Sequence, residues 1–490
     1  MVLRTLWRLL SPRFARDRLP RNDVGSIGEK DMTTNKRIIV VLVFISVLFL
    51  ALIGYLTYWT LFNAQAVAEN PYNLRNVADE NAVLRGNIYD RNGVVLASSK
   101  INSDGTQTRN YPFGALYSGV IGYNSPIYGK SGLEKSYNND LLGKGNILGL
   151  QPTQGNALYL TIDNNLQQIA QAQLGQRKGA VVAINPQTGE ILALADYPNF
   201  DPNEIQLENS WQDLVENQDS PFLNRALNGL YQPGSTFKII TTAAILANGG
   251  GNETFKDTGS TNIDGKVFTN YHSESYGNVD LAKAFAMSSN VAFCTWGSEV
   301  GGTNLRNMAM NFGFEGSMDI GIPVTSSSFP QKSMSLADVA AASIGQWNIL
   351  ATPIEMARAA GIIANGGRDV NLHLVDRVVN KDGGIVQKNS DGMGKQVIDS
   401  GIASQIKDLM IGVVKSGTAT NAAISGVQVA GKTGTAENAI KNKEHAWFVA
   451  FVPADNPTIA VAVCLENAGQ TGSVAAVPIA REVIKAALGR

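Results

Sequence analysis

The chain has 490 residues, with 40 Lys and Arg against 41 Asp and Glu, so its net charge is −1. At about 150 residues per domain, this length allows roughly three domains, and the balanced charge gives no reason to expect a nucleic acid as partner. Two cysteines and three histidines lie far apart in the sequence, which predicts neither a disulfide framework nor a metal site. We expect no cofactor and no metal.

An apolar segment near the N-terminus predicts a transmembrane helix. Residues 38–58 contain no charge, and 15 of these 21 residues are Ile, Leu, Val or Phe. At about 0.3–0.6 kcal/mol each, these residues favour insertion into a bilayer by roughly 6 kcal/mol. The 37 preceding residues contain nine Arg or Lys and four acids, and positive charge beside a span tends to stay in the cytoplasm. We predict a cytoplasmic basic tail over residues 1–37, a retained anchor over residues 38–59, and an extracytoplasmic remainder.

Two other interpretations of this segment remain open. The sequence Ala64-Gln65-Ala66 has the form of a signal-peptidase site, although the apolar stretch is longer than the usual core of about 7–15 residues in a signal peptide. The segment could also be a buried helix of a soluble protein, because no side of it is polar enough to face water.

The part beyond the anchor is predicted to form a small module and a large one. Residues 85–97 predict two short strands around an Asn92-Gly93 turn. Residues 101–150 have no long periodic run. Residues 60–155 are therefore predicted to form a membrane-proximal, β-rich pedestal without catalytic function.

Residues 156–490 have the pattern of one α+β domain. Two strands at residues 180–184 and 190–195 come first, and Ala-rich helical patterns fill most of residues 235–415. Three strands and a closing helix follow. Strands from both ends of the segment can form one antiparallel sheet, with helices inserted between them. The late elements are predicted at residues 427–435, 445–452, 457–465 and 475–488.

Ser235 and Lys238 form the first candidate catalytic pair. A Pro233-Gly234 turn precedes Ser235 and an apolar helical pattern follows it, so Ser235 is predicted at a helix N-terminus, where backbone N–H groups favour negative charge. Lys238 lies one turn later on the same helix face. A neutral lysine amine can remove the serine proton if burial or a neighbouring cation lowers its pKa.

Single short motifs carry little information in this chain, because S-x-x-K, S-x-N and Lys-[Ser/Thr]-Gly each occur more than once. Only one combination places all three in order: Ser235 with Lys238, Ser288 with Asn290, and Lys432 with Gly434. These members also lie at a predicted helix start, a turn into a helix and a strand end. We interpret the other copies, at residues 404–407, 136–138, 130–132 and 415–417, as structural.

With these motifs the chain resembles the class B penicillin-binding proteins, which are membrane-anchored, monofunctional peptidoglycan D,D-transpeptidases. The resemblance implies the penicillin-binding-protein transpeptidase fold, with a five-stranded antiparallel sheet flanked by helices and a helical subdomain. The chain departs from the usual family pattern at Trp347, where many relatives have a small residue. Further stretches similar to the family are residues 85–97, 132–134, 179–196, 345–346, 352–353, 430–437 and 445–448.

The resemblance also implies the role of each motif residue. Ser235 would be the acyl-accepting nucleophile and Lys238 its general base. Ser288 would relay a proton to or from the leaving amine, and Asn290 would bind the substrate backbone. Lys432 would supply positive potential that keeps Lys238 neutral and attracts an anionic substrate.

The strand that follows Lys432 would bind the donor peptide. Thr433, Gly434 and Thr435 would contact the terminal carboxylate of a D-Ala-D-Ala stem peptide. The backbone N–H groups of Ser235 and Thr435 would form the oxyanion hole, and one such donor is typically worth about 10² to 10³ in rate. The expected ligands are therefore peptidoglycan stem peptides on lipid-linked glycan strands, and β-lactams that acylate Ser235.

The resemblance places the protein in the bacterial cytoplasmic membrane, with a polytopic glycan polymerase of the shape, elongation, division and sporulation type as partner. A β-lactamase shares the three motifs, but no Glu-x-x-Leu-Asn element lies between Asn290 and Lys432. A D,D-carboxypeptidase, or a non-catalytic β-lactam sensor or scaffold, remains as an alternative. We expect Cys294, His445 and Trp447 to have packing roles, whereas Glu437 either borders the cleft or is solvated.

Overall fold

The computed structural model describes residues 28–62, 80, 83–144, 153–330, 333–389, 392–437 and 443–490. The chain divides into two units, residues 1–73 and 74–490. The first contains helix α2 (Gly28–Phe62). The predicted basic tail up to residue 27 and the sequence Ala64-Gln65-Ala66 lie outside the described residues.

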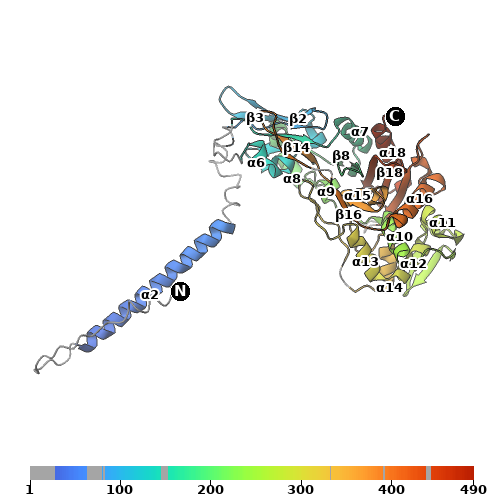
Figure 1. Ribbon diagram of the computed structural model, residues 1–490, viewed down its shortest axis with the longest axis horizontal. Coiled ribbons are helices and arrows are strands. Elements are labelled where there is room, and N and C mark those ends of the chain that lie inside the picture. The colour runs from blue at the N-terminus through green and yellow to red at the C-terminus, as the bar shows by residue number, and fades with distance from the viewer. Residues whose placement is uncertain are drawn as a thin grey trace, which may run out of the picture. The chain divides into compact units, whose positions relative to one another are not determined.

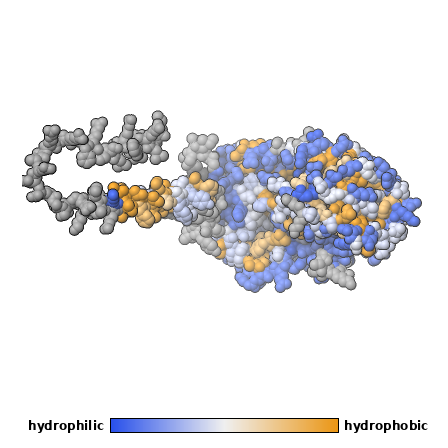
Figure 2. Space-filling view, turned by 90° about the horizontal axis from the view of Figure 1, so that it is seen from below, coloured by the Kyte–Doolittle hydropathy of each residue, from blue (hydrophilic) through white to orange (hydrophobic). Residues whose placement is uncertain are grey.

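Helix α2 contains the predicted apolar segment. Its stretch Ile38–Phe62 has a mean hydropathy of 3.0 and is not buried within the chain, and Figure 2 shows hydrophobic side chains gathered on this helix. At about 1.5 Å per residue, 25 residues exceed the hydrocarbon core of about 30 Å. It is the one helix of the described residues that is long and apolar enough to cross a membrane, and it ends at Phe62 rather than at the predicted residue 59.

The centre of the second unit is the predicted five-stranded antiparallel sheet, built from both ends of the transpeptidase-like segment (Figure 1). Two strands come early in the sequence and three come late, as predicted. The strand order is β17-β18-β19-β7-β8. The bounds are β7 (Gly179–Ile184), β8 (Ile191–Tyr197), β17 (Ala430–Ala436), β18 (His445–Val452) and β19 (Ile459–Leu465).

The strands of this sheet are buried on both faces because helices cover it on both sides. All seven residues of β19 are buried, which explains its unbroken apolar sequence, Ile-Ala-Val-Ala-Val-Cys-Leu. Helices α7 and α18 pack together and against the sheet, whereas α15 packs against β7, β18 and β19 and contacts α16 (Figure 1). These helices are α7 (Asn164–Leu174), α15 (Pro353–Ala364), α16 (Ser400–Ser416) and α18 (Val477–Ala487).

A helical subdomain follows β8, and its helices are short. Side chains of the residues before them cap several N-termini; Asp280, for example, accepts a hydrogen bond from the N–H of Lys283 at 2.8 Å. The helices are α10 (Lys238–Ala247), α11 (Leu281–Ala286), α12 (Asn290–Val300), α13 (Gly302–Asn311) and α14 (Leu336–Ser343).

Four short strands interrupt this subdomain, and the sequence analysis did not predict them. They form two two-stranded sheets, β9–β12 and β10–β11. The hairpin turn of β10–β11 is Asp264-Gly265, with φ of 52° and 80°, which is the geometry that an Asp-Gly pair favours. The strands are β9 (Phe255–Asp257), β10 (Ser260–Ile263), β11 (Lys266–Thr269) and β12 (Gly277–Val279).

The predicted pedestal hairpin belongs to a six-stranded sheet that draws on distant parts of the chain. Strand β1 pairs antiparallel with β2, as predicted, and parallel with β6. Strand β14 then pairs with β6, with Val375 opposite Leu160. The order is β15-β14-β6-β1-β2-β3, with β1 (Ile88–Tyr89), β2 (Val95–Ile101), β3 (Gln107–Asn110), β6 (Ala157–Leu160), β14 (Val375–Val379) and β15 (Ile385–Lys388).

A buried ion cluster joins the parts of the pedestal. The carboxylate of Glu134 is fully buried and accepts hydrogen bonds from Nε of Arg85 at 2.6 Å and Nε of Arg109 at 2.7 Å. Burial alone would raise the pKa of Glu134, but the two guanidinium groups hold it below its usual value. The stretches at residues 85–97 and 132–134, which are similar to the family, therefore meet at this cluster.

The remaining elements are short. They lie in the pedestal and in the connections between the longer helices and strands. They are η1 (Gly114–Tyr117), β4 (Asn124–Ser125), β5 (Gly129–Lys130), α5 (Gly132–Ser136), α6 (Asn138–Leu141), α8 (Glu204–Glu216), α9 (Arg225–Asn228), η2 (Gly234–Phe237), η3 (Tyr271–Ser273), β13 (Arg368–Val370), β16 (Met393–Gln396), η4 (Thr420–Ala422) and α17 (Gly472–Ala475).

Candidate active site

Ser235 lies in the one-turn helix η2, which continues directly into α10, so it occupies the predicted helix start. The preceding Gly234 has φ of 53°, and a Cβ on it would lie 2.6 Å from the carbonyl oxygen of Thr435. Only glycine fits there, because a side chain would push η2 away from β17. The helix that carries Ser235 therefore lies directly against the strand that carries Lys432. Ser235 itself is half-buried.

The Lys238 side chain is fully buried one turn after Ser235, and it reaches the second motif. Its Nζ donates hydrogen bonds to the carbonyl oxygen of Ser288 at 2.7 Å and to Oδ1 of Asn290 at 2.9 Å. The Ser235 hydroxyl has no hydrogen-bond partner among the residues that the structure describes. Burial lowers the pKa of Lys238 to about 7. A large share of this amine is therefore uncharged near neutral pH, as a general base requires.

Lys432 reaches the same turn from strand β17. Lys432 is fully buried on this strand. Its Nζ donates hydrogen bonds to the Ser288 hydroxyl at 2.9 Å and to the backbone carbonyl of Thr433, the next residue, at 3.2 Å. Burial lowers the pKa of Lys432, and the charge of Lys238 lowers it further. The two amines titrate as a pair, because a proton on one disfavours a proton on the other.

The turn between the two lysines has an unusual backbone. Ser288 has φ of 58°, in the left-handed region that residues other than glycine seldom adopt, at a cost of about 1 kcal/mol or more. In this conformation Ser288 presents its carbonyl oxygen to Lys238 and its hydroxyl to Lys432. Three motifs that lie far apart in the sequence thus meet through one serine.

Strand β17 contributes the remaining predicted residues. Thr433 is buried, and its Oγ1 lies 2.5 Å from Oγ1 of Thr418. The sequence analysis did not identify Thr418 as a residue of the site. Thr435 is half-buried, and its hydroxyl accepts a hydrogen bond from the N–H of Gly472 at 3.4 Å. Gly434 has no room for a side chain, because a Cβ would lie 2.9 Å from the carbonyl oxygen of Pro233.

The tryptophans beside the site have structural contacts. Trp447, on β18, donates a hydrogen bond from Nε1 to the carbonyl of Gln232 at 2.9 Å, and Gln232 donates from Nε2 to the carbonyl of Trp347 at 2.6 Å. Trp347 is the residue at which the chain departs from the family pattern. Its backbone carbonyl, as acceptor from Gln232, therefore helps to fix the segment before Ser235. Its φ of 64° places that carbonyl in an uncommon backbone conformation.

The other residues expected to have packing roles do pack. Cys294 is buried, and His445 packs edge-on against Tyr231 with ring centroids 5.3 Å apart. Glu437 is exposed at the end of β17.

Three of the second copies of the motifs lie away from the site and have structural contacts, whereas the fourth, at residues 415–417, lies at the end of α16, and its Ser416 lines a cavity beside the Ser288 turn. Ser404 is exposed on α16, where Lys407 forms an ion pair with Asp455 at 3.5 Å. In the pedestal, Asn138 accepts a hydrogen bond from Arg85, and Lys130 pairs with Glu80. The described residues contain no group of His, Cys, Asp and Glu that could hold a metal ion.

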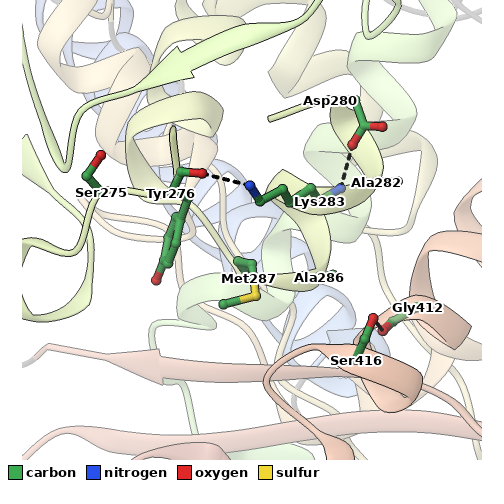
Figure 3. Close-up of a pocket in the computed structure, with 9 residues that line it drawn as sticks. All are labelled: Ser275, Tyr276, Asp280, Ala282, Lys283, Ala286, Met287, Gly412 and Ser416. Carbon is green, nitrogen blue, oxygen red and sulfur yellow. Dashed lines mark hydrogen bonds between the residues drawn. The ribbon is translucent and has the colours of Figure 1, made fainter. Parts of the chain in front are cut away.

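A cavity of about 660 Å³ lies beside the turn (Figure 3). None of the residues predicted for the site lines it, although Met287 on its wall directly precedes Ser288. The side chain of Lys283 forms part of the cavity wall, and its Nζ donates a hydrogen bond to the backbone carbonyl of Tyr276 at 2.8 Å. The cavity is lined by Ser275, Tyr276, Asp280, Ala282, Lys283, Ala286, Met287, Gly412 and Ser416.

Comparison with known proteins identifies the family. Residues 179–485 match the penicillin binding protein transpeptidase domain, and residues 85–156 match the penicillin binding protein A dimerisation domain. The chain belongs to the penicillin-binding protein transpeptidase family, and within it to class B, as the motifs predicted.

Both sequences and structures of relatives support this assignment. The peptidoglycan D,D-transpeptidase PbpA of Mycobacterium tuberculosis is 36% identical over 91% of this chain and 98% of its own length. The peptidoglycan D,D-transpeptidase MrdA of Acinetobacter baumannii is 31% identical over 81% of this chain and 69% of its own. Among solved structures, the imipenem acyl-enzyme complex of penicillin-binding protein A from M. tuberculosis is 35% identical, with a TM-score of 0.78 over 84% of this chain and 99% of that one.

Proposed function

We propose that the protein is a serine-type peptidoglycan D,D-transpeptidase that cross-links stem peptides and binds β-lactams. The observation that carries this proposal is the convergence of Lys238 and Lys432 on Ser288, beside the helix turn of Ser235. The relatives named peptidoglycan D,D-transpeptidases and the solved acyl-enzyme complexes support the same activity.

In the first step, Oγ of Ser235 attacks the carbonyl carbon between the two D-Ala residues of the donor. The Ser235 proton passes to the neutral amine of Lys238, and the new ester bond forms as the peptide C–N bond breaks. The leaving D-Ala nitrogen takes a proton through the hydroxyl of Ser288. The hydrogen bond between Ser288 and Lys432 supports this relay, because it keeps that hydroxyl between the two amines.

In the second step, an amine of another stem peptide attacks the ester carbonyl. Its proton is removed, the C–O bond to Ser235 breaks, and the Ser235 oxygen regains a proton, so that the cross-link forms and the enzyme is restored. The backbone N–H groups of Ser235 and Thr435 would hold the oxyanion in both steps. The close packing of Gly234 on Thr435 supports this role, because it brings the two segments into contact.

The donor carboxylate would bind along β17. Thr433, Gly434 and Thr435 would contact it, and the positive charge shared by the two lysines would attract it. Asn290 would bind the donor backbone, although its Oδ1 already accepts a hydrogen bond from Lys238. The same contacts would orient a β-lactam, whose acylation of Ser235 leaves an ester in the site.

The decisive experiment measures cross-linking of lipid-linked glycan strands by the wild type and by Ser235→Ala. Loss of both the cross-link and covalent β-lactam labelling in the variant supports the proposal, and equal cross-linking by both proteins contradicts it. D-Ala release without cross-links would indicate a D,D-carboxypeptidase, with water as the acceptor. β-Lactam labelling without either product would indicate a sensor or scaffold.

We further propose that α2 anchors the protein once in the bacterial cytoplasmic membrane, with the basic tail inside and the enzyme outside. The apolar stretch Ile38–Phe62 supports the anchor. The proposed division is a tail over residues 1–37, an anchor over 38–59, a pedestal over 60–155 and a transpeptidase domain over 156–490. A polytopic glycan polymerase of the shape, elongation, division and sporulation type is the proposed partner, and its co-purification from membranes tests this.

A further inference from the structure

A buried carboxylate lies behind the turn that carries Ser288 and Asn290. Asp257 is the last residue of β9, and its side chain is almost fully buried. One of its oxygens lies 2.5 Å from Oγ of Ser289, and the other accepts the N–H of Gly259 at 2.8 Å. Among the described residues, no lysine or arginine forms an ion pair with it. Neutral donors therefore offset the cost of burying this charge.

Asn270 connects this carboxylate to the start of α12. Its side-chain amide donates to both oxygens of Asp257 at 2.8 Å. Its Oδ1 accepts the backbone N–H of Asn290 at 2.8 Å and that of Val291 at 3.1 Å. Only one orientation of the amide satisfies both sets of partners, because a carboxylate accepts and a backbone N–H donates.

Ser289 completes the support from inside the turn. Its Oγ donates to Asp257 and accepts the N–H of Ala292 at 3.0 Å. The first N–H groups of α12 thus have side-chain acceptors in Ser289 and Asn270, which is how an otherwise unpaired helix start is stabilised. Ser289 is the middle residue of the S-x-N motif, a position at which the motif allows any amino acid.

The network ends at the proposed general base. Asn290 donates from Nδ2 to the carbonyl of Thr269 at 2.9 Å, and this bond orients its Oδ1 toward Lys238 at 2.9 Å. Ser288 has the strained φ described above, a conformation that persists only where its surroundings enforce it. Hydrogen bonds therefore run without a break from Asp257 through Asn270 and Asn290 to Lys238.

We propose that Asp257 is a positioning residue: acting through Asn270 and Ser289, it fixes the Ser288–Asn290 turn against Lys238. This inference rests on the proposed acyl-transfer chemistry at Ser235. A displacement of about 1 Å in such a support can cost up to about 10² in rate.

The negative charge of Asp257 has a second effect, which separates it from its neutral partners. It favours the protonated form of Lys238 and so opposes the lowering of the pKa by burial. The other titratable group that acts on this amine is Cys294 on α12, and Lys432 on β17 is bonded to the same Ser288 hydroxyl. Loss of the Asp257 charge should therefore make Lys238 easier to deprotonate.

The test measures the rate of Ser235 acylation by a fluorescent penicillin as a function of pH, in the full-length protein. The variants are Asp257→Asn, Asn270→Ala and Ser289→Ala. The control is Asp90→Asn, because Asp90 is also fully buried and, among the residues that the structure describes, accepts only backbone N–H groups, those of Asn92, Val94 and Asn164.

We expect all three variants to acylate about 10-fold or more slowly at the pH plateau, with the folded fraction checked by circular dichroism. In Asp257→Asn the rise of the rate with pH should also move to lower pH, whereas in Ser289→Ala and Asn270→Ala it should stay in place. Asp90→Asn should keep both the plateau and the position of the rise.

Wild-type plateau rates in Ser289→Ala and Asn270→Ala would overturn the proposal, even if Asp257→Asn does not fold. An equal loss of rate in Asp90→Asn would also overturn it, because the effect would then be general destabilisation. The proposed function fails separately: in that case the wild type itself would not be acylated at Ser235.

Discussion

Lys238 and Lys432 both donate hydrogen bonds to Ser288. Lys238 donates to its carbonyl at 2.7 Å and to its hydroxyl at 3.4 Å, whereas Lys432 donates to the hydroxyl at 2.9 Å. Two buried amines this close cannot both hold a proton at low cost, because each charge disfavours the other. At least one of the two amines at Ser288 is therefore uncharged near neutral pH.

Acylation of Ser235 should depend on pH through this pair. Because burial lowers the pKa of Lys238 to about 7, the rate should fall as the pH drops below about 7 and level off above it. Stopped-flow measurements with a fluorescent penicillin from about pH 5 to pH 9 would show this. Lys238→Arg should lose the reaction at every pH, because a guanidinium does not release its proton. A pH-independent wild-type rate would contradict the assignment of the base.

A side chain at Gly434 should separate the two halves of the site. A Cβ there would lie 2.9 Å from both the Pro233 oxygen and Cγ2 of Thr236, so Gly434→Ala should displace η2 from β17 and slow acylation by about 10²-fold. Gly412→Ala is a matched control, because a Cβ there meets nothing within 4 Å. On α16 that change should preserve the acylation rate and slightly raise the melting temperature. Equal acylation by both variants would disprove the steric argument.

Removal of the buried charge at Glu134 should destabilise the pedestal. Glu134→Gln leaves the guanidinium groups of Arg85 and Arg109 without their counter-ion, and breaking such a buried pair typically costs about 3–5 kcal/mol. Urea denaturation would measure this loss. Asp382→Asn, which removes the exposed partner of Lys381, should leave the midpoint unchanged. A Glu134→Gln midpoint equal to that of the wild type would show that the cluster does not stabilise the fold.

Thr418 should affect the donor site through Thr433. Their hydroxyl oxygens are 2.5 Å apart, so Thr418→Val removes the partner that orients the Thr433 hydroxyl. A lost hydrogen bond of about 1 kcal/mol corresponds to an approximately fivefold lower second-order rate constant for acylation. Thr458→Val, at the turn before β19, provides a comparison on the same sheet. An unchanged rate constant in Thr418→Val would mean that Thr433 is oriented by other contacts.

The residues proposed to carry the chemistry could be singled out from the sequence because they occur in local motifs. Ser235 and Lys238 lie one helical turn apart, and their order relative to the other two motifs separated them from the second copies. The central sheet was predictable for a related reason. Strands such as β7 and β19 are continuous apolar runs, as buried strands are, and the early and late positions of the five strands indicated how they could form one sheet.

The supporting residues had no comparable signal. Asp257 and Asn270 lie 32 and 20 residues before their partners Ser289 and Asn290, and a single Asp or Asn in a polar stretch is usually solvated. Asp257 ends the three-residue strand β9 and Asn270 follows the four-residue strand β11, and such strands are too short for a clear alternation. The Asp264-Gly265 turn was the one local indication of a hairpin there. The pairing of β14 with β6 joins residues more than 200 positions apart, which no local pattern specifies.

The shared six-stranded sheet determines where the chain can be shortened. Strand β6 lies between β14 and β1, so a fragment that begins at residue 156 lacks one neighbour of β6 and exposes its backbone N–H and C=O groups. Such a bare strand edge invites intermolecular pairing. A secreted, anchor-free version intended for crystallisation or inhibitor screening should therefore begin before residue 83, so that β1 remains in place.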